Sequence, residues 1–177
     1  AYASVFGTVT PTYLFGPCAT GVYKMPAAYS NVKAVFTNTA PVDAYRGAGR
    51  PEATYTIERL VEKAAVELGM DKTEIRMKNF PTEFPFQQTL VHSVDSGDYV
   101  AGMNKAKEMA DYGGFEKRRQ ESETKGKLRG IGVTTYFEAC GIAPSAVVMS
   151  LGCGIGLWES AEVRFNPTGN VTVFTGS

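Results

Sequence analysis

A glycine-rich segment that runs directly into an amphipathic pattern places the strongest constraint on how this chain folds. The segment reads Ala44-Tyr-Arg-Gly-Ala-Gly-Arg-Pro-Glu52. Gly47 and Gly49 tolerate positive φ angles and allow the backbone to approach a ligand closely. Pro51 suits the first position of a helix, where the missing N–H costs nothing. The sequence therefore predicts a tight loop that leads into a helix.

Two arginines of this segment, Arg46 and Arg50, indicate that the loop holds an anion. Amides at a helix start and guanidinium groups both stabilise a phosphate or an oxyanion. Spacing alone leaves a second interpretation open, because glycine-rich turns are weak motifs. A simple loop-to-helix junction with solvated arginines would contain the same residues.

Helical periodicity continues after the loop. Apolar residues that share one face stand at positions 57, 60, 61, 64, 65 and 68, and charged residues such as Glu58 lie elsewhere. Gly69 is suited to end this helix. Asp71 and Glu74 have the spacing of a capping box, which predicts a second, short helix that Pro81 stops.

Two further helices are predicted at 98–110 and 115–125, with Gly113-Gly114 between them. The second of these is highly charged, and we interpret it as a solvated face instead of a docking surface. The composition then changes from helix-rich to strand-rich near residue 126. This change predicts one domain over 1–125 and the start of a second over 126–177.

Strand patterns are fewer than helical ones. Alternating residues predict a strand at 32–38 and a half-buried strand at 131–138. A turn at 166–170 predicts a hairpin between strands at 161–165 and 171–175. Because helices and strands both occur, the predicted fold class is α+β.

Charge and cysteine content exclude several classes of function. Lys plus Arg and Asp plus Glu both number 18, so there is no basis for a nucleic-acid or anionic-membrane partner, and no stretch is long and apolar enough for a membrane span. The cysteines lack C-x-x-C spacing and His92 is the single histidine, which excludes iron–sulfur, zinc and Ser-His-Asp sites within the chain. Such cysteines are typical of a reducing, cytoplasmic compartment. The run Gly152–Gly156 lacks the glycine spacing of a dinucleotide-binding loop.

An ordered set of segments resembles one known family. AYRGAGRPEA continues through the helical pattern to Gly69-Met-Asp71 and then to EIRMKNF. The further similar segments are Asn38–Asp43, Asp95–Asp98, Leu128–Gly132 and Trp158–Val163. This order is similar to that of the molybdenum-binding large subunit of the xanthine dehydrogenase and aldehyde oxidase family, and especially to its aerobic carbon monoxide dehydrogenase-like branch. The resemblance implies an internal fragment of the molybdopterin-binding region.

The resemblance implies that the glycine loop lies beside the molybdenum of a pterin dithiolene cofactor. In this family the pterin sulfurs hold the metal, so no protein metal ligand is expected. Arg46 is expected to be catalytic, because its positive charge would lie near the metal's ligands and the developing anionic substrate. The residues expected to bind the cofactor are Tyr45, Arg46, Gly47, Ala48, Gly49 and Arg50.

The resemblance also implies partners and redox centres outside this chain. The expected cofactor is the cytosine dinucleotide form of the molybdenum–pterin group. Iron–sulfur clusters and FAD are expected on a small and a medium partner subunit, within a dimer of heterotrimers. The family's catalytic glutamate and further cofactor loops lie outside these residues, so the chain alone is not expected to be active.

Three positions bear on the substrate. Gly47 stands where true carbon monoxide dehydrogenases of the family carry a cysteine that binds copper, and glycine cannot bind copper. Ala48 and Leu14 stand where purine-hydroxylating relatives carry a phenylalanine and an arginine. The preferred chemistry is therefore hydroxylation of an aldehyde or an N-heterocycle with water as the oxygen source. The alternatives are genuine carbon monoxide oxidation, a non-catalytic segment that contacts another subunit, and nucleotide binding by the chain alone.

Overall fold

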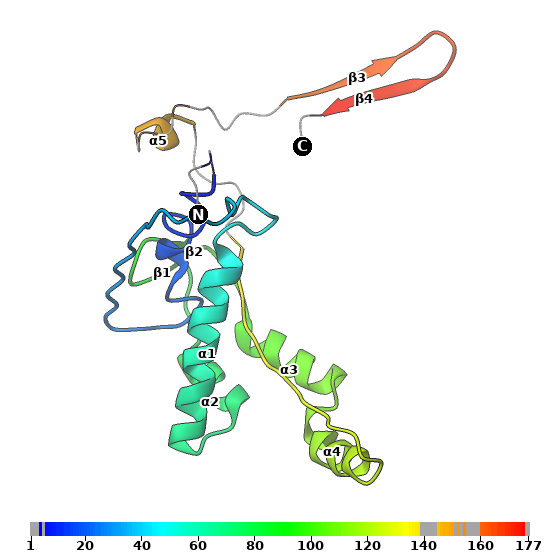
Figure 1. Cartoon of the computed structure of the whole chain (residues 1–177). Coiled ribbons are helices and arrows are strands. Elements are labelled where there is room, and N and C mark those ends of the chain that lie inside the picture. Colours follow the sequence, from blue (N-terminus) through cyan, green and yellow to red (C-terminus); the bar gives the residue numbers. More distant parts are fainter. Residues whose placement is uncertain are drawn as a thin grey trace. The chain divides into compact units, whose positions relative to one another are not determined.

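The computed structural model describes residues 4, 6–138, 145–150, 152, 154 and 160–175. The chain divides into two compact units, Ala1–Glu138 and Ala139–Ser177 (Figure 1). The first contains most of the helices, and the second contains a short helix and a β-hairpin. This combination of helices and small sheets confirms the predicted α+β class. The domain boundary predicted between residues 125 and 126 stays a prediction.

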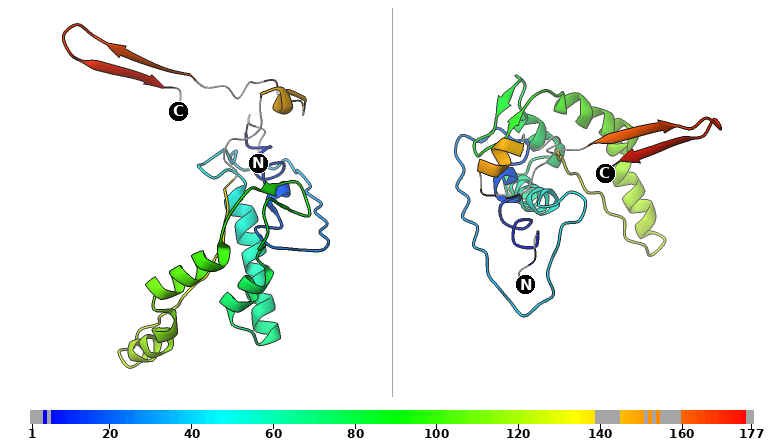
Figure 2. Two further views of the ribbon diagram at one scale, coloured as in Figure 1. Left: turned by 180° about the vertical axis from the view of Figure 1, so that it is seen from behind. Right: turned by 90° about the horizontal axis from the view of Figure 1, so that it is seen from above.

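The helix after the glycine loop is α1 (Arg50–Leu68), and the short helix that follows is α2 (Lys72–Asn79). Gly69 ends α1 in the left-handed conformation, with φ of 63°. The Asp71 carboxylate caps α2 by accepting hydrogen bonds from the amides of Thr73 and Glu74. Both predicted helix ends are thus confirmed, and the two helices pack side by side (Figure 2).

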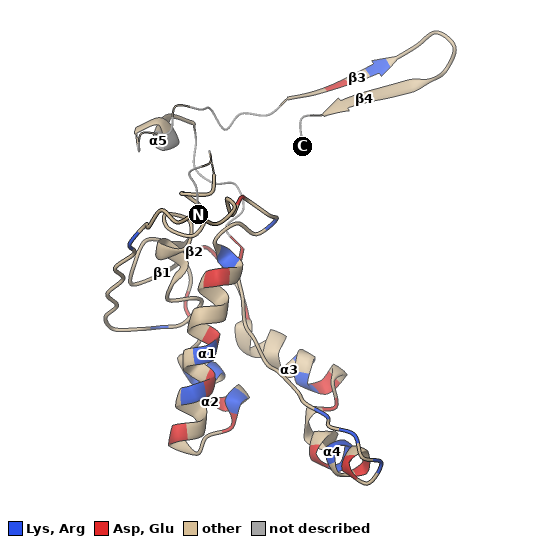
Figure 3. Ribbon diagram, viewed as in Figure 1, with Lys and Arg blue, Asp and Glu red and all other residues tan. Residues whose placement is uncertain are grey.

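The next two helices also lie where the sequence predicts them. Helix α3 (Tyr99–Met109) starts at Asp98, whose side chain accepts from the Ala101 amide. The glycine pair forms a 3-10 turn, η2 (Tyr112–Gly114), and α4 (Phe115–Glu123) follows directly. Charges of both signs cover α4 (Figure 3). Arg119 bonds Glu116 and Glu123 of the same helix, as expected for a solvated face.

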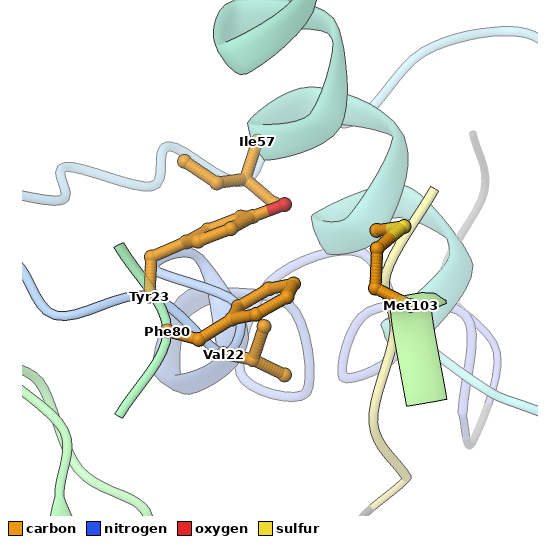
Figure 4. Packing of buried hydrophobic residues seen from close by; sticks show 5 residues of the cluster. All are labelled: Val22, Tyr23, Ile57, Phe80 and Met103. Carbon is orange, nitrogen blue, oxygen red and sulfur yellow. The ribbon is translucent and has the colours of Figure 1, made fainter. Parts of the chain in front are cut away.

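The core of the first unit joins segments that are far apart in the sequence. It contains Val22, Tyr23, Ile57, Phe80 and Met103 (Figure 4). The Tyr23 and Phe80 rings stack with their centroids 5.8 Å apart. Val22 and Tyr23 lie shortly after the 3-10 turn η1 (Gly16–Cys18), which was not predicted. The core is therefore built from loop and helix residues together.

The buried face of α1 differs in part from the predicted stripe. Ile57 and Ala65 are buried, but Leu60 and Leu68 are 59% and 65% exposed. Conversely Glu58, predicted to lie off the buried face, is only 6% exposed. Its carboxylate accepts hydrogen bonds from Tyr23 and, at 2.8 Å, from Nε of Arg76, and a partnered charge tolerates burial.

Two predicted strands are wrong, because a strand needs a hydrogen-bonded neighbour. Residues 32–38 are exposed and form no ladder with any described residue. Residues 131–138 are also unpaired there, although their burial alternates as predicted, with Val133 and Phe137 packed against the core. The small hairpin of β1 (Phe86–Gln87) and β2 (Ser93–Val94) was not predicted.

The second unit contains α5 (Ser145–Ser150) and the predicted hairpin of β3 (Ala161–Phe165) and β4 (Val171–Thr175). The strands are antiparallel, and Phe165 pairs with Val171 beside the turn. Cys140, Cys153 and the first two residues of the segment Trp158–Val163 lie outside the described residues, and the last three residues of that segment belong to β3. No helix among the residues described is long and apolar enough to span a membrane.

Candidate cofactor-binding loop

Three consecutive residues of the glycine loop have positive φ angles. The values are 110° at Gly47, 21° at Ala48 and 84° at Gly49. The Ala48 amide donates to the carbonyl of Tyr45 at 2.8 Å, and the Arg50 amide donates to that of Gly47 at 3.0 Å. Ala48 is unusual because a residue with a Cβ rarely adopts such a φ, and strained backbone of this kind clusters at ligand-binding sites.

Position 49 needs glycine for two reasons: its φ angle is positive, and there is no room for a Cβ. A Cβ placed there would lie 2.6 Å from the carbonyl carbon of Leu14 and 2.8 Å from the carbonyl oxygen of Thr10. Both are backbone atoms, which cannot rotate away as the end of a side chain can. The loop is therefore seated directly against the segment that contains Thr10 and Leu14.

The two arginines of the loop have opposite environments. Arg46 and its neighbour Tyr45 are exposed, and Arg46 forms no hydrogen bond or ion pair within the part of the chain that the structure describes. Arg50 is only 7% exposed. Its Nη1 donates to the carbonyl oxygen of Ala48 at 2.9 Å, and its Nε lies 3.4 Å from Oε1 of Glu138. Arg46 thus has a free cationic group, whereas the charge of Arg50 is used inside the protein.

Cys18 and His92 also lie in the electrostatic field of Arg50. Burial raises the pKa of the Cys18 thiol, and the charge of Arg50 opposes that rise. Burial lowers the pKa of His92, and Arg50 lowers it further. The His92 ring meets the edge of Phe137 with the centroids 6.1 Å apart. A protonated thiol and a neutral imidazole are therefore favoured, which agrees with a structural and not a nucleophilic Cys18.

The donors that remain available suit an anion. Pro51 has no N–H, and the Arg50 amide is used within the loop, so the helix start offers fewer amides than predicted. The amides of Gly47 and Gly49 donate no hydrogen bond to the described residues. Gly49 is buried and Gly47 half-buried, so the exposed guanidinium of Arg46 is the most accessible donor in the loop, and such a group suits an oxyanion or a phosphate. No group of His, Cys, Asp and Glu residues that would hold a metal ion occurs in the ranges searched.

The six residues predicted to bind a cofactor are contiguous, and the structure places Tyr45–Gly49 in one loop and Arg50 at the first position of α1. Whether each contacts the cofactor stays a prediction. Sequence reasoning missed Glu138, because it stands on the exposed side of the alternating segment 131–138 and shows no motif of its own. It also missed the backbone contacts to Thr10 and Leu14, since such contacts leave no pattern in the sequence.

Comparison with known proteins identifies the family. Two molybdopterin cofactor-binding domain models match residues 1–80 and 105–177. The chain is 38% identical over 177 residues to the carbon monoxide dehydrogenase large chain of Hydrogenophaga pseudoflava, a match that covers 96% of this chain and 22% of that protein. The chain belongs to the molybdenum hydroxylase large subunits. This confirms the resemblance seen in the sequence, and these domains bind a molybdenum–pterin cofactor.

Solved structures of molybdenum hydroxylases have the same fold over this region. The crystal structure of quinoline 2-oxidoreductase from Pseudomonas putida 86 matches with a TM-score of 0.79 and 35% identity, over 95% of this chain and 22% of that one. A Cu,Mo-CO dehydrogenase structure matches with a TM-score of 0.69 and 33% identity, over 92% and 22%. The chain thus spans about a fifth of the length of these molybdenum hydroxylase subunits.

Arg50 and Glu138 fall in different matched regions of this molybdenum hydroxylase sequence. Arg50 lies within the first matched domain, residues 1–80, and Glu138 lies within the second, residues 105–177. Both belong to the first compact unit, so the ion pair between them is internal to that unit.

Proposed function

We propose that the full-length protein is the catalytic large subunit of a molybdenum hydroxylase that hydroxylates an aldehyde or an N-heterocycle with oxygen from water. The observation that carries this proposal is the segment Tyr45–Arg50, in which Arg46 is exposed and has no partner among the described residues, next to Gly47 and Gly49, whose amides donate to none of them. A cation beside the reacting group stabilises negative charge that develops during a reaction.

The residues of the loop have separate roles in this proposal. Arg46 binds and orients the anionic part of the reacting system, and the glycine amides add donors. Tyr45 and Ala48 complete the wall of the site, while the missing Cβ of Gly49 lets the loop lie against Leu14. The molybdenum–pterin group supplies the redox chemistry and the activated water-derived oxygen when it is bound.

We further propose the cytosine dinucleotide form of the cofactor. An iron–sulfur small subunit and an FAD-binding medium subunit would receive the electrons, and the complex would be a dimer of heterotrimers. These assignments follow from the family, in which the large subunit transfers electrons to separate redox centres.

Residue 47 supports an organic substrate. Glycine has no side chain, so Gly47 offers no thiolate that could hold copper, the second metal of the related Cu,Mo-CO dehydrogenase. Ala48 has no ring to stack on a purine. The similarity to quinoline 2-oxidoreductase supports an N-heterocycle. Carbon monoxide oxidation stays the second candidate, because a relative with 38% identity is named carbon monoxide dehydrogenase large chain.

Replacement of Arg46 tests the proposal. In the full-length protein, Arg46→Ala should lower kcat/KM by on the order of a hundredfold on quinoline or benzaldehyde, at equal molybdenum content, because one fixed charge is removed. Arg59→Ala is the matched control, since Arg59 is exposed on α1 and makes no described ion pair. Equal turnover of Arg46→Ala and wild type would support the non-catalytic, structural alternative.

Analysis of the molybdenum and copper content of the purified protein distinguishes hydroxylation of an organic substrate from oxidation of carbon monoxide. The proposal expects molybdenum without copper, and no turnover of carbon monoxide. Copper at one equivalent with carbon monoxide turnover would instead establish the second candidate and would show that Gly47 does not prevent copper binding.

A further inference from the structure

The second arginine of the loop is in an electrostatically unfavourable place. Arg50 is the first residue of α1, where the helix dipole is positive and repels a cation. Its side chain is also 8% exposed, so it has lost most of its hydration. A buried cation at a helix N-terminus needs compensating contacts, and those contacts show what the residue does.

Arg50 makes one contact back to the loop and one across to a distant segment. Nη1 donates to the carbonyl oxygen of Ala48 at 2.9 Å, and Nε lies 3.4 Å from Oε1 of Glu138. Ala48 is the one non-glycine residue with positive φ in the loop. The guanidinium therefore holds the carbonyl of the strained residue through a hydrogen bond, and the carboxylate of Glu138 forms an ion pair with the guanidinium, although Nε itself donates no hydrogen bond to the described residues.

We propose that Arg50 and Glu138 form a positioning pair that fixes the cofactor loop and so aims Arg46, without themselves touching substrate. The two residues lie in different matched regions of the sequence but within one compact unit, so the pair links Arg50 to a segment 88 positions further along the chain. This inference rests on the proposed function, because it assigns the role of Arg50 to the same site. It separates the two arginines: Arg46 acts on the ligand and Arg50 acts through the loop.

Trypsin cleavage of the holoenzyme provides a readout that does not depend on activity. Within the loop, trypsin can cut only after Arg46, because the bond between Arg50 and Pro51 is resistant. Lys33 lies in the exposed segment before the loop and serves as an internal reference. Arg50→Gln should raise the rate of cleavage after Arg46 relative to Lys33 by about tenfold or more, since the charged hydrogen bond to Ala48 and the ion pair with Glu138 are both lost.

Three further variants and a control keep the test informative if Arg50→Gln folds poorly. Glu138→Gln should raise the cleavage ratio less, because the bond to Ala48 remains, and the double variant should exceed Arg50→Gln by less than about twofold, since the two residues act as one unit. Arg50→Lys should restore part of the protection, because lysine keeps the charge but not the two-point geometry. Arg59→Gln makes the same chemical change on the exposed face of α1 and should leave the ratio unchanged.

A spectroscopic measurement separates positioning from simple destabilisation. At equal molybdenum loading, the electron paramagnetic resonance spectrum of the dithionite-reduced protein should change in Arg50→Gln and return towards wild type in Arg50→Lys. An unchanged spectrum and an unchanged cleavage ratio in Arg50→Gln would overturn the positioning role. If the loop loosens in Arg50→Gln but Arg46→Ala retains full turnover, the positioning pair stands and the proposed function of Arg46 fails.

Discussion

At the scale of single residues, Asp71 joins two parts of the fold with one carboxylate. It accepts from the amides of Thr73 and Glu74 at 2.8 and 3.1 Å and from the hydroxyl of Tyr112 at 2.9 Å. Burial disfavours the ionised carboxylate, but the hydrogen bond from the Thr73 hydroxyl, followed by those from Tyr112 and the two amides, outweighs that effect and lowers the pKa of Asp71 from 3.8 to about 2. Burial of Tyr112 and its hydrogen bond to Asp71 raise the pKa of Tyr112 to about 12.

Loss of the Asp71 cap should destabilise α2 locally. Asp71→Ala should lower the free energy of opening of the first turn of α2 by about 1 kcal/mol, a usual value for an N-cap. Hydrogen exchange of the amides of Thr73 and Glu74 in the full-length protein measures this. Because the pKa of Asp71 is lower in the folded state, its contribution is present above pH 3.8 and is lost as the pH falls towards about 2. Tyr112→Phe removes one bond only and should have a smaller effect; an equal effect would contradict the role of the cap.

Gly49 provides a second residue-scale test, with Gly69 as its control. Both glycines have positive φ, but a Cβ at Gly69 would meet no atom within 4 Å, whereas one at Gly49 would press on the backbone of Leu14. Gly69→Ala should lower the free energy of unfolding by only about 1 kcal/mol, which is the cost of a residue with a Cβ at positive φ. Gly49→Ala should in addition displace the loop and reduce the molybdenum content of the purified protein by more than half. Full molybdenum content in Gly49→Ala would show that the loop can move without loss of the cofactor.

At the scale of elements, a buried ion pair fastens α1 to α2. Arg76 is fully buried and Glu58 nearly so, and Nη2 of Arg76 also lies 3.3 Å from Oε2 of Glu62. Burial alone would lower the pKa of Arg76, but the hydrogen bond and charge of Glu58 raise it. Glu58→Gln should lower the free energy of opening of α2 by about 3 kcal/mol, because it leaves the buried charge of Arg76 without its main partner.

The control for this prediction is an exposed pair on α3. Lys105 and Glu108 are 2.8 Å apart, but both side chains are more than half exposed. Glu108→Gln should therefore change stability by less than about 1 kcal/mol. Hydrogen exchange of α2 and α3 amides in the full-length protein compares the two variants. Similar losses in both would contradict the importance of burial for the Arg76 pair.

The same elements show what the sequence can predict. Helix ends were predictable because caps such as Asp71 and Gly69 act locally, on residues within one turn. Glu58 was assigned to the wrong side of α1 because its partner Arg76 belongs to another helix, so the reason for its burial is not local. Segment 131–138, which pairs with no strand among the described residues, shows the same limit: alternation predicts which side chains are buried, but not whether another strand lies beside them.

The candidate site also has one part that the sequence predicts and one part that it does not. The loop from Tyr45 to Arg50 was predicted as one group because its residues are contiguous. The inward direction of Arg50 was not predictable, since it depends on Glu138, which is 88 positions further along the chain. A long-range ion pair of this kind becomes visible only when the fold brings the two residues together.

At the scale of the whole molecule, the two units differ in how many of their apolar side chains are buried. The first has a core around Tyr23 and Ile57, with α1 and α2 packed together. In the second, every residue of β3 and β4 is exposed, including Phe165 and Val171. A two-stranded hairpin without a covered face is only marginally stable in water.

Hydrogen exchange of the isolated 177-residue chain should reflect this difference. Amides in the middle of α1 should be protected at least about a hundredfold more strongly than those of β3 and β4, because only the former lie against a core. Exposed apolar strand residues and unpaired strand edges should also make the chain aggregate as its concentration rises, which light scattering detects. Val173→Lys on β4 should reduce that aggregation without changing the protection of α1. Equal protection of the hairpin and α1 would show instead that the second unit is stabilised by contacts of its own.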